Sequence, residues 1–201
     1  MEVEFAGLKL RAEPGVVMIP RPATERLVAV AAARIGHVPA RVADVGTGAG
    51  AIAVALAVRA PAATVWATDV SAGAVRLTRL NARRHGVESR VHVLVGDLLE
   101  PIEPPLDLVV ANLPYLPDRL AGAPGYEEYD AEPREAIFAP GSGIGPYLRL
   151  LDQAESRLRP GGGLVIQYHR RVLESDREEI PRLRAVLRYA ESRAAASMPG
   201  S

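Results

Sequence analysis

The chain has 201 residues, of which 48% are hydrophobic and only 4% are aromatic, and its formal net charge is zero. This length suits one domain with a core of mainly aliphatic side chains, and a neutral chain has no general field that attracts polyanions. The sequence contains no cysteine, which excludes disulfides, thiolate metal sites and cysteine nucleophiles.

Signals for export and for membrane insertion are missing from the sequence. The first residues lack the basic and then apolar order of a signal peptide, and no apolar run approaches the ~20 residues that cross a bilayer. Four histidines, at positions 37, 85, 92 and 169, do not have the spacing of metal ligands. We therefore expect a cytoplasmic protein with no contact with a membrane and no metal.

The N-terminal residues predict a β-hairpin followed by a helix. The hairpin is expected over residues 3–19, with strands at 3–10 and 16–19 and a turn at Glu13-Pro14-Gly15. The two prolines of residues 20–25 predict a rigid, non-helical segment. Thr24 then suits the N-cap of a helix over residues 25–35, which Gly36 can end.

A glycine-rich loop follows the first strand expected in the core, at residues 41–45. It begins after Asp44-Val45 and comprises Gly46, Thr47, Gly48, Ala49 and Gly50. Glycines let the backbone turn sharply and approach a ligand, and the helix that follows, to about Ala60, presents free N–H groups. This pattern predicts a cofactor loop, but it also satisfies the dinucleotide fingerprint, and a tight turn without a ligand is the simpler alternative.

Two further strands end in acidic residues. Residues 64–68 lead to Asp69, whose carboxylate can accept hydrogen bonds from both hydroxyls of an adenosine ribose. NAD enzymes use the same position, so Asp69 does not decide between cofactors. After it, Ser71 predicts the cap of a helix to Arg84, which Gly86 ends.

The next strand, residues 90–95, leads to Asp97 and Leu98. The Asp97 carboxylate could accept a hydrogen bond from an adenine amino group while Leu98 packs on the ring. Taken alone, an acid after a strand is most often a loop residue. Asp97 is informative here because its strand is the third consecutive one that ends in a polar ligand candidate.

The apolar run of residues 106–111 predicts a buried parallel strand that leads into Asn112, Leu113, Pro114 and Tyr115. Pro114 cannot donate to a sheet, so strand pairing should stop there. Asn112 has a side-chain acceptor and Tyr115 a flat aromatic face. These residues are the predicted catalytic corner, because open α/β sheets bind ligands at the carboxyl ends of their strands.

The C-terminal third is less regular. Residues 116–145 are expected to close over a substrate or to be a disordered insertion. A helix should run from Pro146 to Arg159, with a core face of Leu148, Leu151, Ala154 and Leu158. A turn at 160–163 precedes a fifth strand at 164–168, whose exposed edge a second copy of the chain could cover.

Together these elements predict an α/β fold with a doubly wound, mostly parallel sheet of the Rossmann-like kind. We expect one domain over residues 1–201. It comprises a hairpin and linker at 1–22, a catalytic core at 23–169 and a divergent helical tail at 170–201.

The motifs resemble those of class I S-adenosylmethionine methyltransferases, and more narrowly the HemK-type protein-(glutamine-N5) methyltransferases that modify peptide-chain release factors. Residues 19–25, Ile-Pro-Arg-Pro-Ala-Thr-Glu, are similar to that family's Ile-Pro-Arg-Pro-x-Thr-Glu. Residues 112–115 fall on its Asn-Pro-Pro-Tyr, and residues 129–133 resemble its Tyr-Glu-Pro segment. Three features differ: the family's N-terminal helical domain has no counterpart, Leu113 replaces a proline, and no closing pair of strands is recognisable after Tyr168.

The resemblance implies specific roles for these residues. Residues 44–50 would hold the methionine part of S-adenosylmethionine, Asp69 the ribose, and Asp97 with Leu98 the adenine. Asn112 Oδ1 and the Leu113 carbonyl would accept hydrogen bonds from the NH₂ of a glutamine amide, on which Tyr115 would stack. The expected partner is a protein, such as a release factor.

Two alternatives stay open. The sequence Asn-Leu-Pro-Tyr also resembles the motif of adenine-N6 ribosomal RNA dimethylases, so the amino group could belong to a base of RNA or DNA. The third candidate is a non-catalytic nucleotide-binding or scaffold protein of the same fold.

Overall fold

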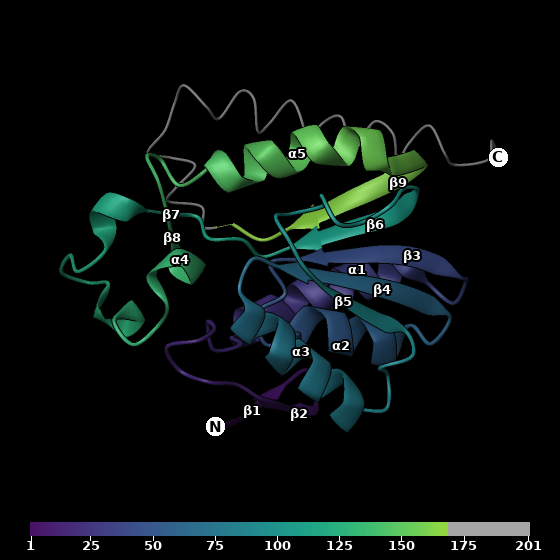
Figure 1. The fold of residues 1–201 in the computed structure, drawn as a ribbon, viewed down its shortest axis with the longest axis horizontal. Coiled ribbons are helices and arrows are strands. Elements are labelled where there is room, and N and C mark those ends of the chain that lie inside the picture. The colour runs from purple at the N-terminus through teal and green to yellow at the C-terminus, as the bar shows by residue number, and fades with distance from the viewer. Residues whose placement is uncertain (169–201) are drawn as a thin grey trace.

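A computed structural model describes residues 1–168, in which five parallel strands form one sheet with helices on both faces (Figure 1). The strands lie in the order β5 (Val91–Val95), β4 (Ala63–Asp69), β3 (Ala40–Val45), β6 (Leu106–Ala111) and β9 (Leu158–Ile166). The predicted α/β class with a doubly wound sheet is therefore confirmed. The chain winds outward from β3 to β5 and then returns to place β6 on the other side of β3, which is the topological switch point of such sheets.

Apolar side chains lie on both faces of the sheet. Val42 and Val110 face one core with helices α1 (Glu25–Ile35), α2 (Ala51–Arg59) and α3 (Ala72–Arg84). Ala43 and Val109 face the other core with helix α5 (Gly145–Arg157). Successive residues of a strand point to opposite faces, so an unbroken apolar run indicates a strand that is buried on both.

The predicted hairpin exists, but its boundaries were wrong. Strands β1 (Glu2–Phe5) and β2 (Leu8–Arg11) pair antiparallel across a loop of Ala6 and Gly7, and residues 16–19 form no strand. Both loop residues have positive φ, 54° and 81°, which two-residue hairpin turns require to match the twist of the strands. Alanine rarely adopts this conformation, so the sequence carries no strong turn signal there.

Thr24 does not cap α1, although the helix itself is confirmed. Residues Pro22–Thr24 form a 3-10 turn (η1), and Thr24 has helical φ and ψ of −78° and −15° with no side-chain capping bond. An N-cap residue normally has extended dihedrals that direct its hydroxyl at the next turn. In contrast, Ser71 does cap α3, because its hydroxyl accepts a hydrogen bond from the Ala74 N–H at 3.3 Å.

Residues 116–145 have local structure of their own. Strands β7 (Leu116–Pro117) and β8 (Phe138–Ala139) pair in parallel, and between them lie η2 (Asp118–Leu120), η3 (Glu127–Tyr129) and α4 (Arg134–Ile137). Figure 1 shows this segment projecting beside the carboxyl ends of the main strands. Residues 116–145, called the flap below, thus contain short regular elements in this structure.

The predicted turn at 160–163 is instead an irregular part of β9. Leu158 pairs with Leu106 and Gly163 with Leu108, so five residues of β9 cover the same step as two of β6. This bulge absorbs the glycines within the strand. The buried face of α5 is also shifted from the predicted one, and its members are Tyr147, Leu150, Leu151 and Ala154.

Strand β9 forms one edge of the sheet within the part of the chain that the structure describes. Covering of this edge by a second copy of the chain stays a prediction. The predicted helical tail at 170–201 lies outside the described residues. Across residues 1–168, no helix is both long and apolar enough to cross a membrane.

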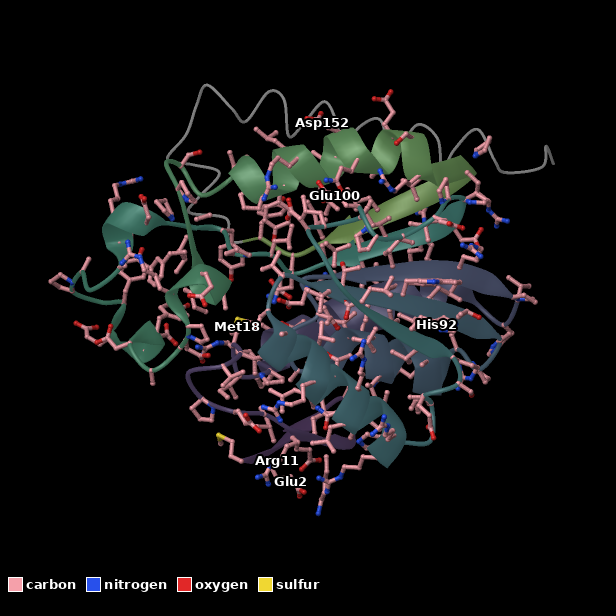
Figure 2. All side chains as sticks on the ribbon, in the orientation of Figure 1. Glu2, Arg11, Met18, His92, Glu100 and Asp152 are labelled. Atoms are coloured by element: carbon pink, nitrogen blue, oxygen red, sulfur yellow. The ribbon has the colours of Figure 1, made fainter. Side chains whose placement is uncertain are left out.

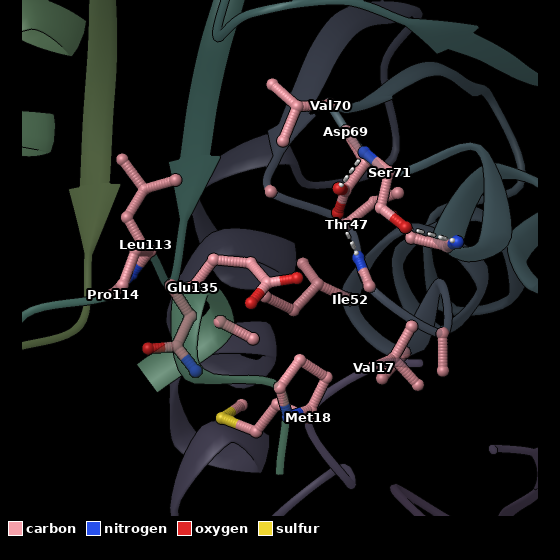
Figure 3. Close-up of a pocket in the computed structure, with 18 of the residues that line it drawn as sticks. Val17, Met18, Thr47, Ile52, Asp69, Val70, Ser71, Leu113, Pro114 and Glu135 are labelled. Carbon is pink, nitrogen blue, oxygen red and sulfur yellow. Dashed lines mark hydrogen bonds between the residues drawn. The ribbon is translucent and has the colours of Figure 1, made fainter. Parts of the chain in front are cut away.

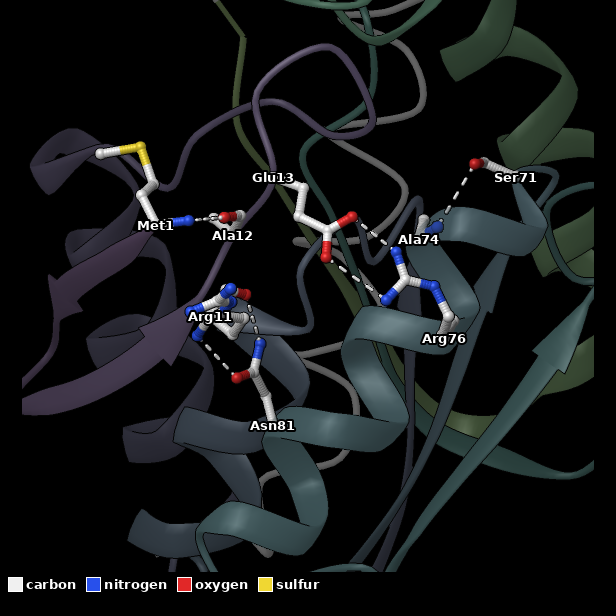
Figure 4. A network of polar contacts seen from close by, with 8 residues as sticks. All are labelled: Met1, Arg11, Ala12, Glu13, Ser71, Ala74, Arg76 and Asn81. Atoms are coloured by element: carbon white, nitrogen blue, oxygen red, sulfur yellow. Dashed lines mark hydrogen bonds and ion pairs between the residues drawn. The ribbon is translucent and has the colours of Figure 1, made fainter.

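Asn81 of α3 connects the hairpin to the glycine-rich loop, and Figure 4 shows its two bonds with Arg11. Its side chain is fully buried, accepts a hydrogen bond from the Arg11 N–H at 2.7 Å, and donates to the carbonyls of Arg11 and Ala49 at 2.8 Å each. One side chain therefore satisfies three backbone groups from two distant segments. We expect the hairpin to depend on it more than on any pair of surface charges.

Replacing Asn81 with alanine tests this dependence. We expect the free energy of unfolding in urea to fall by about 2–4 kcal/mol, because the partner groups lose their bonds while partly or fully buried. The matched control is Leu80→Ala, one residue earlier and 43% exposed, which should cost less than about 1 kcal/mol. Equal losses from both substitutions would contradict the role given to Asn81.

Candidate active site

A cavity of about 260 Å³ opens at the carboxyl ends of β3, β4, β5 and β6 (Figure 3). It lies at the switch point between β3 and β6, where open α/β sheets bind ligands. Within residues 1–168 it gathers all but two of the predicted site residues. Those that line it are Gly46, Thr47, Gly48, Ala49, Asp69, Asp97, Leu98, Asn112, Leu113 and Pro114.

The two predicted residues outside the lining are Gly50 and Tyr115. Gly50 has a φ of 80°, and a Cβ there would lie 2.8 Å from the Thr78 side chain, so this glycine permits close packing of α2 on α3. Tyr115 is half-buried and packs against the flap residues Leu116 and Phe138. Stacking of Tyr115 on an acceptor amide stays a prediction.

Gly46 and Gly48 form the floor of the cavity for different reasons. A Cβ at Gly46 would lie 2.8 Å from Leu113 Cδ2, so this glycine lets the loops after β3 and β6 approach each other. A Cβ at Gly48 would meet nothing within 4 Å, and its φ is 56°. Gly48 therefore supplies a left-handed turn whose open side a ligand can approach.

Asp69 at the tip of β4 holds the loop and faces the cavity. Its Oδ2 accepts a hydrogen bond from the Gly48 N–H and its Oδ1 from the Ser71 N–H, both at 2.9 Å. Burial raises the pKa of Asp69, although these backbone bonds oppose the shift. Each oxygen has a further lone pair, so the carboxylate can still accept bonds from two hydroxyls.

Asp44 is fully buried beneath the same loop. Its Oδ2 accepts bonds from the Thr47 hydroxyl at 2.6 Å and the Ala53 N–H at 3.0 Å, while its Oδ1 has no hydrogen-bond partner. Burial raises the pKa of Asp44 to about 7, against the effect of the two donors. Near neutral pH the side chain can therefore be a protonated acid or a buried anion.

Arg149 is a cavity residue that sequence analysis missed. It extends from α5 and forms an ion pair with Asp97, the residue predicted to bind an adenine amino group. Leu98, the residue after Asp97, has a φ of 51°, and its carbonyl accepts a hydrogen bond from the Thr68 hydroxyl at 2.7 Å. An arginine on a helix surface has no sequence signal that would distinguish it from its exposed neighbours.

Hydroxyl groups hold the predicted catalytic corner from two sides. The Asn112 Nδ2 donates to the Thr24 hydroxyl at 3.3 Å. This bond uses the amide nitrogen of Asn112 and not its Oδ1. The backbone of Leu113 bonds to the Tyr147 hydroxyl. Thr24 is 4% exposed and Tyr147 is 2% exposed, so both partners are fixed in the core.

Two segments distant in sequence complete the wall of the cavity. The first contributes Met18 and Pro20, and the second Pro133, Glu135 and Ala136. Figure 3 labels Met18 and Glu135 among the lining side chains. The expected closing of residues 116–145 over a substrate, and the resemblance of residues 19–25 and 129–133 to known motifs, pointed to these segments.

An arginine joins the two segments. The Arg21 guanidinium pairs with Glu132 at 3.2 Å and with Glu128 at 3.4 Å, and it lies 5.1 Å from the centroid of the Tyr129 ring. The second oxygen of Glu132 accepts the Ile19 N–H at 2.9 Å. The flap is thereby attached to the segment before α1.

Comparison with curated proteins finds several relatives that share one name. A release factor glutamine methyltransferase from Moorella thermoacetica is 41% identical over 167 residues, which cover 82% of this chain and 58% of the relative. Proteins of that name from Gloeobacter violaceus and Deinococcus radiodurans are 40% and 38% identical over 80% and 94% of this chain, and 56% and 64% of their own lengths. The chain thus spans less than two thirds of these relatives.

Solved structures show the same fold at low sequence identity. The catalytic domain of hMettl16 in complex with a MAT2A 3'UTR hairpin has a TM-score of 0.66 and 20% identity, over 91% of this chain and 67% of that one. The ribosomal protein L11 methylase from Lactobacillus delbrueckii subsp. bulgaricus has a TM-score of 0.59 and 24% identity, over 90% and 74%.

The characteristic sequence of the methyltransferase small domain matches residues 14–121, from the segment before α1 to the start of the flap. This match covers more than half of the chain and contains the glycine-rich loop, both acidic strand ends and the corner after β6. The chain therefore belongs to the methyltransferase small domain family.

Proposed function

We propose that this protein is an S-adenosylmethionine-dependent N-methyltransferase whose acceptor is the side-chain amide of a protein glutamine, with a peptide-chain release factor as the first acceptor to test. The observation that carries the proposal is that Asn112 and Leu113 line the same cavity as Gly48 and Asp69. A group that accepts hydrogen bonds from an amide and a loop suited to a nucleoside are thus adjacent. The names of the curated relatives supply the acceptor.

The residues of the cavity fit the cofactor. Gly48 leaves open space beside the loop, and Asp69 keeps lone pairs for two ribose hydroxyls. Leu98 and Val70 give apolar surface near Asp97. When bound, S-adenosylmethionine would supply a methyl group on an electrophilic sulfonium.

The corner after β6 would prepare the acceptor. An amide nitrogen is a weak nucleophile because its lone pair is delocalised into the carbonyl, as in the peptide unit. Asn112 Oδ1 and the Leu113 carbonyl can accept bonds from its two N–H groups and so hold the nitrogen in one orientation. Such positioning can contribute several kcal/mol to lowering the barrier, and the proton can leave after transfer.

The charge of the flap favours a protein acceptor over a nucleic acid. Residues 126–135 contain five carboxylates and one arginine, and Glu135 lines the cavity while Glu127 and Asp130 are exposed. A polyanion that approached the opening would meet like charge. Fold similarity to a protein solved with an RNA hairpin shows the fold alone.

Asn112→Ala tests the central assignment. We expect methyl transfer from labelled S-adenosylmethionine to a purified bacterial release factor to fall about 100-fold or more. Binding of S-adenosylmethionine by calorimetry should change less than about threefold, because Asn112 acts on the acceptor. The control is Asp118→Ala, an exposed residue of η2 that should keep wild-type turnover. Full turnover by Asn112→Ala would refute the assignment.

Asp44 predicts a pH dependence of stability. Its pKa is raised from 3.8 to about 7 in the folded state, so the folded protein binds a proton that the unfolded chain has released. This contribution to stability is fully present below about pH 4 and is lost as the pH rises through about 7. Between pH 5 and pH 8 the loss should be on the order of 2 kcal/mol.

The measurement compares the wild type with Asp44→Asn, which cannot ionise. Urea unfolding at pH 5 and pH 8 should show that the stability of the wild type relative to the variant is lower at pH 8. The comparison cancels the other carboxylates, which both chains share. Parallel pH profiles would mean that Asp44 keeps its ordinary pKa.

The rival acceptor class predicts a different response to salt. Nucleic-acid binding should weaken steeply with added salt because phosphate contacts release counterions. For this protein we expect binding of single-stranded and hairpin RNA to be weak at low salt, and KM for a release factor to change less than about threefold between 50 and 200 mM salt. Tight RNA binding with a steep salt dependence would favour the base methyltransferase.

A further inference from the structure

Tyr147 lies in the core directly behind the catalytic corner. Its hydroxyl accepts a hydrogen bond from the Leu113 N–H at 3.0 Å and lies 3.1 Å from the Leu113 carbonyl, to which it can donate. Its single proton can be donated either to that carbonyl or to the Gln167 carbonyl just after β9, which is also within hydrogen-bond distance. A single hydroxyl on α5 thus contacts both backbone groups of Leu113 and the end of the neighbouring strand.

The environment of Tyr147 suits a permanent structural hydroxyl. The residue is 2% exposed, and burial raises its pKa well above the ordinary value for tyrosine. The hydroxyl therefore stays protonated across the range in which proteins are folded. Because it has one proton and the Leu113 carbonyl has two lone pairs, that carbonyl keeps the capacity to accept a second bond.

The contact with the N–H depends on the identity of residue 113. A proline at this position would have a fixed φ and no N–H. Leucine has a free φ, and its N–H needs a partner because the residue is 5% exposed. Tyr147 supplies that partner. Pro114 restricts Leu113 from the other side, because a residue before proline favours extended dihedrals.

We propose that Tyr147 is a positioning residue that fixes the Leu113 carbonyl in the orientation in which it accepts a bond from the acceptor amide. The inference rests on the proposed function and names how one of its two acceptor oxygens is held. Thr24 holds the other through the Asn112 side chain. A different hydroxyl thus positions each of the two acceptor groups: Thr24, from the segment before α1, acts on Asn112, and Tyr147, from α5, acts on Leu113.

Tyr147→Phe removes the hydroxyl and keeps the ring. With a purified release factor as acceptor, we expect kcat to fall about 10-fold while the Kd for S-adenosylmethionine changes less than about twofold. Leu150→Ala is the control, since Leu150 is a fully buried residue of the same helix outside the cavity lining. It should lower Tm at least as much as Tyr147→Phe and keep kcat within about threefold.

A second comparison asks whether the effect passes through Leu113. The loss in kcat caused by Tyr147→Phe should be at least about threefold smaller in a chain that already carries Leu113→Pro, because proline fixes φ at position 113 and removes the N–H, so the orientation of the carbonyl depends less on Tyr147. Equal losses in both chains would overturn the proposed route. If kcat relative to Tm changed in Tyr147→Phe as it does in Leu150→Ala, the loss of stability alone would explain the loss of activity. That result would overturn the positioning role.

A measurement without turnover separates this inference from the proposed function. Hydrogen exchange of the Leu113 amide, followed by NMR, should be at least about 10-fold faster in Tyr147→Phe than in the wild type, with amides in the centre of β3 unchanged. Unchanged exchange at Leu113 would overturn the inference even if the enzyme is active. Faster exchange in a protein that methylates no acceptor would support the hydrogen bond and refute the proposed function.

Discussion

The site depends on the pairing of β3 with β6. Val45 lies opposite Ala111 at the last step of this parallel ladder, so the residues that follow, Gly46 and Asn112, leave the sheet side by side. A shift of either strand by one residue would move the side chains of one core into the other, because side chains alternate with a period of two. Packing of both faces of the sheet thereby fixes the distance between the glycine-rich loop and the corner after β6.

Glycines in the loop after β3 shape the cavity beside this pair of strands. The contact between Leu113 and Gly46 would be blocked by a Cβ, whereas Gly48 faces open space. Gly46 therefore lets the two loops approach each other, and Gly48 leaves room for a ligand. Gly50 has another role, since it lets α2 approach Thr78 of α3. Three glycines at alternate positions thus have three different surroundings, although the sequence pattern suggests one common role.

The strands and their polar ends could be predicted from sequence because each depends on local patterning. Apolar runs that end in glycine, acid or Asn-Leu-Pro indicate parallel strands with ligand groups at one edge. Contacts between distant segments have no such pattern in the sequence. The Arg149 pair with Asp97 and the position of Tyr115 among flap residues depend on how α5 and residues 116–145 fold back. The hairpin loop was missed for a local reason, because Ala6 adopts a positive φ that alanine disfavours.

The attachment of the flap shows why residues 19–25 cannot be understood from their own secondary structure. As a surface ion pair, Arg21 with Glu128 would contribute little to stability. Glu132 differs, since its side chain is 7% exposed and also accepts the Ile19 N–H. A buried carboxylate without its arginine would be an unpaired charge in a poorly solvated place, so the two segments stabilise each other only as a pair. Thr24, three residues after Arg21, then reaches Asn112. The contact that holds the flap over the cavity therefore also sets the position of the hydroxyl that orients the predicted catalytic side chain.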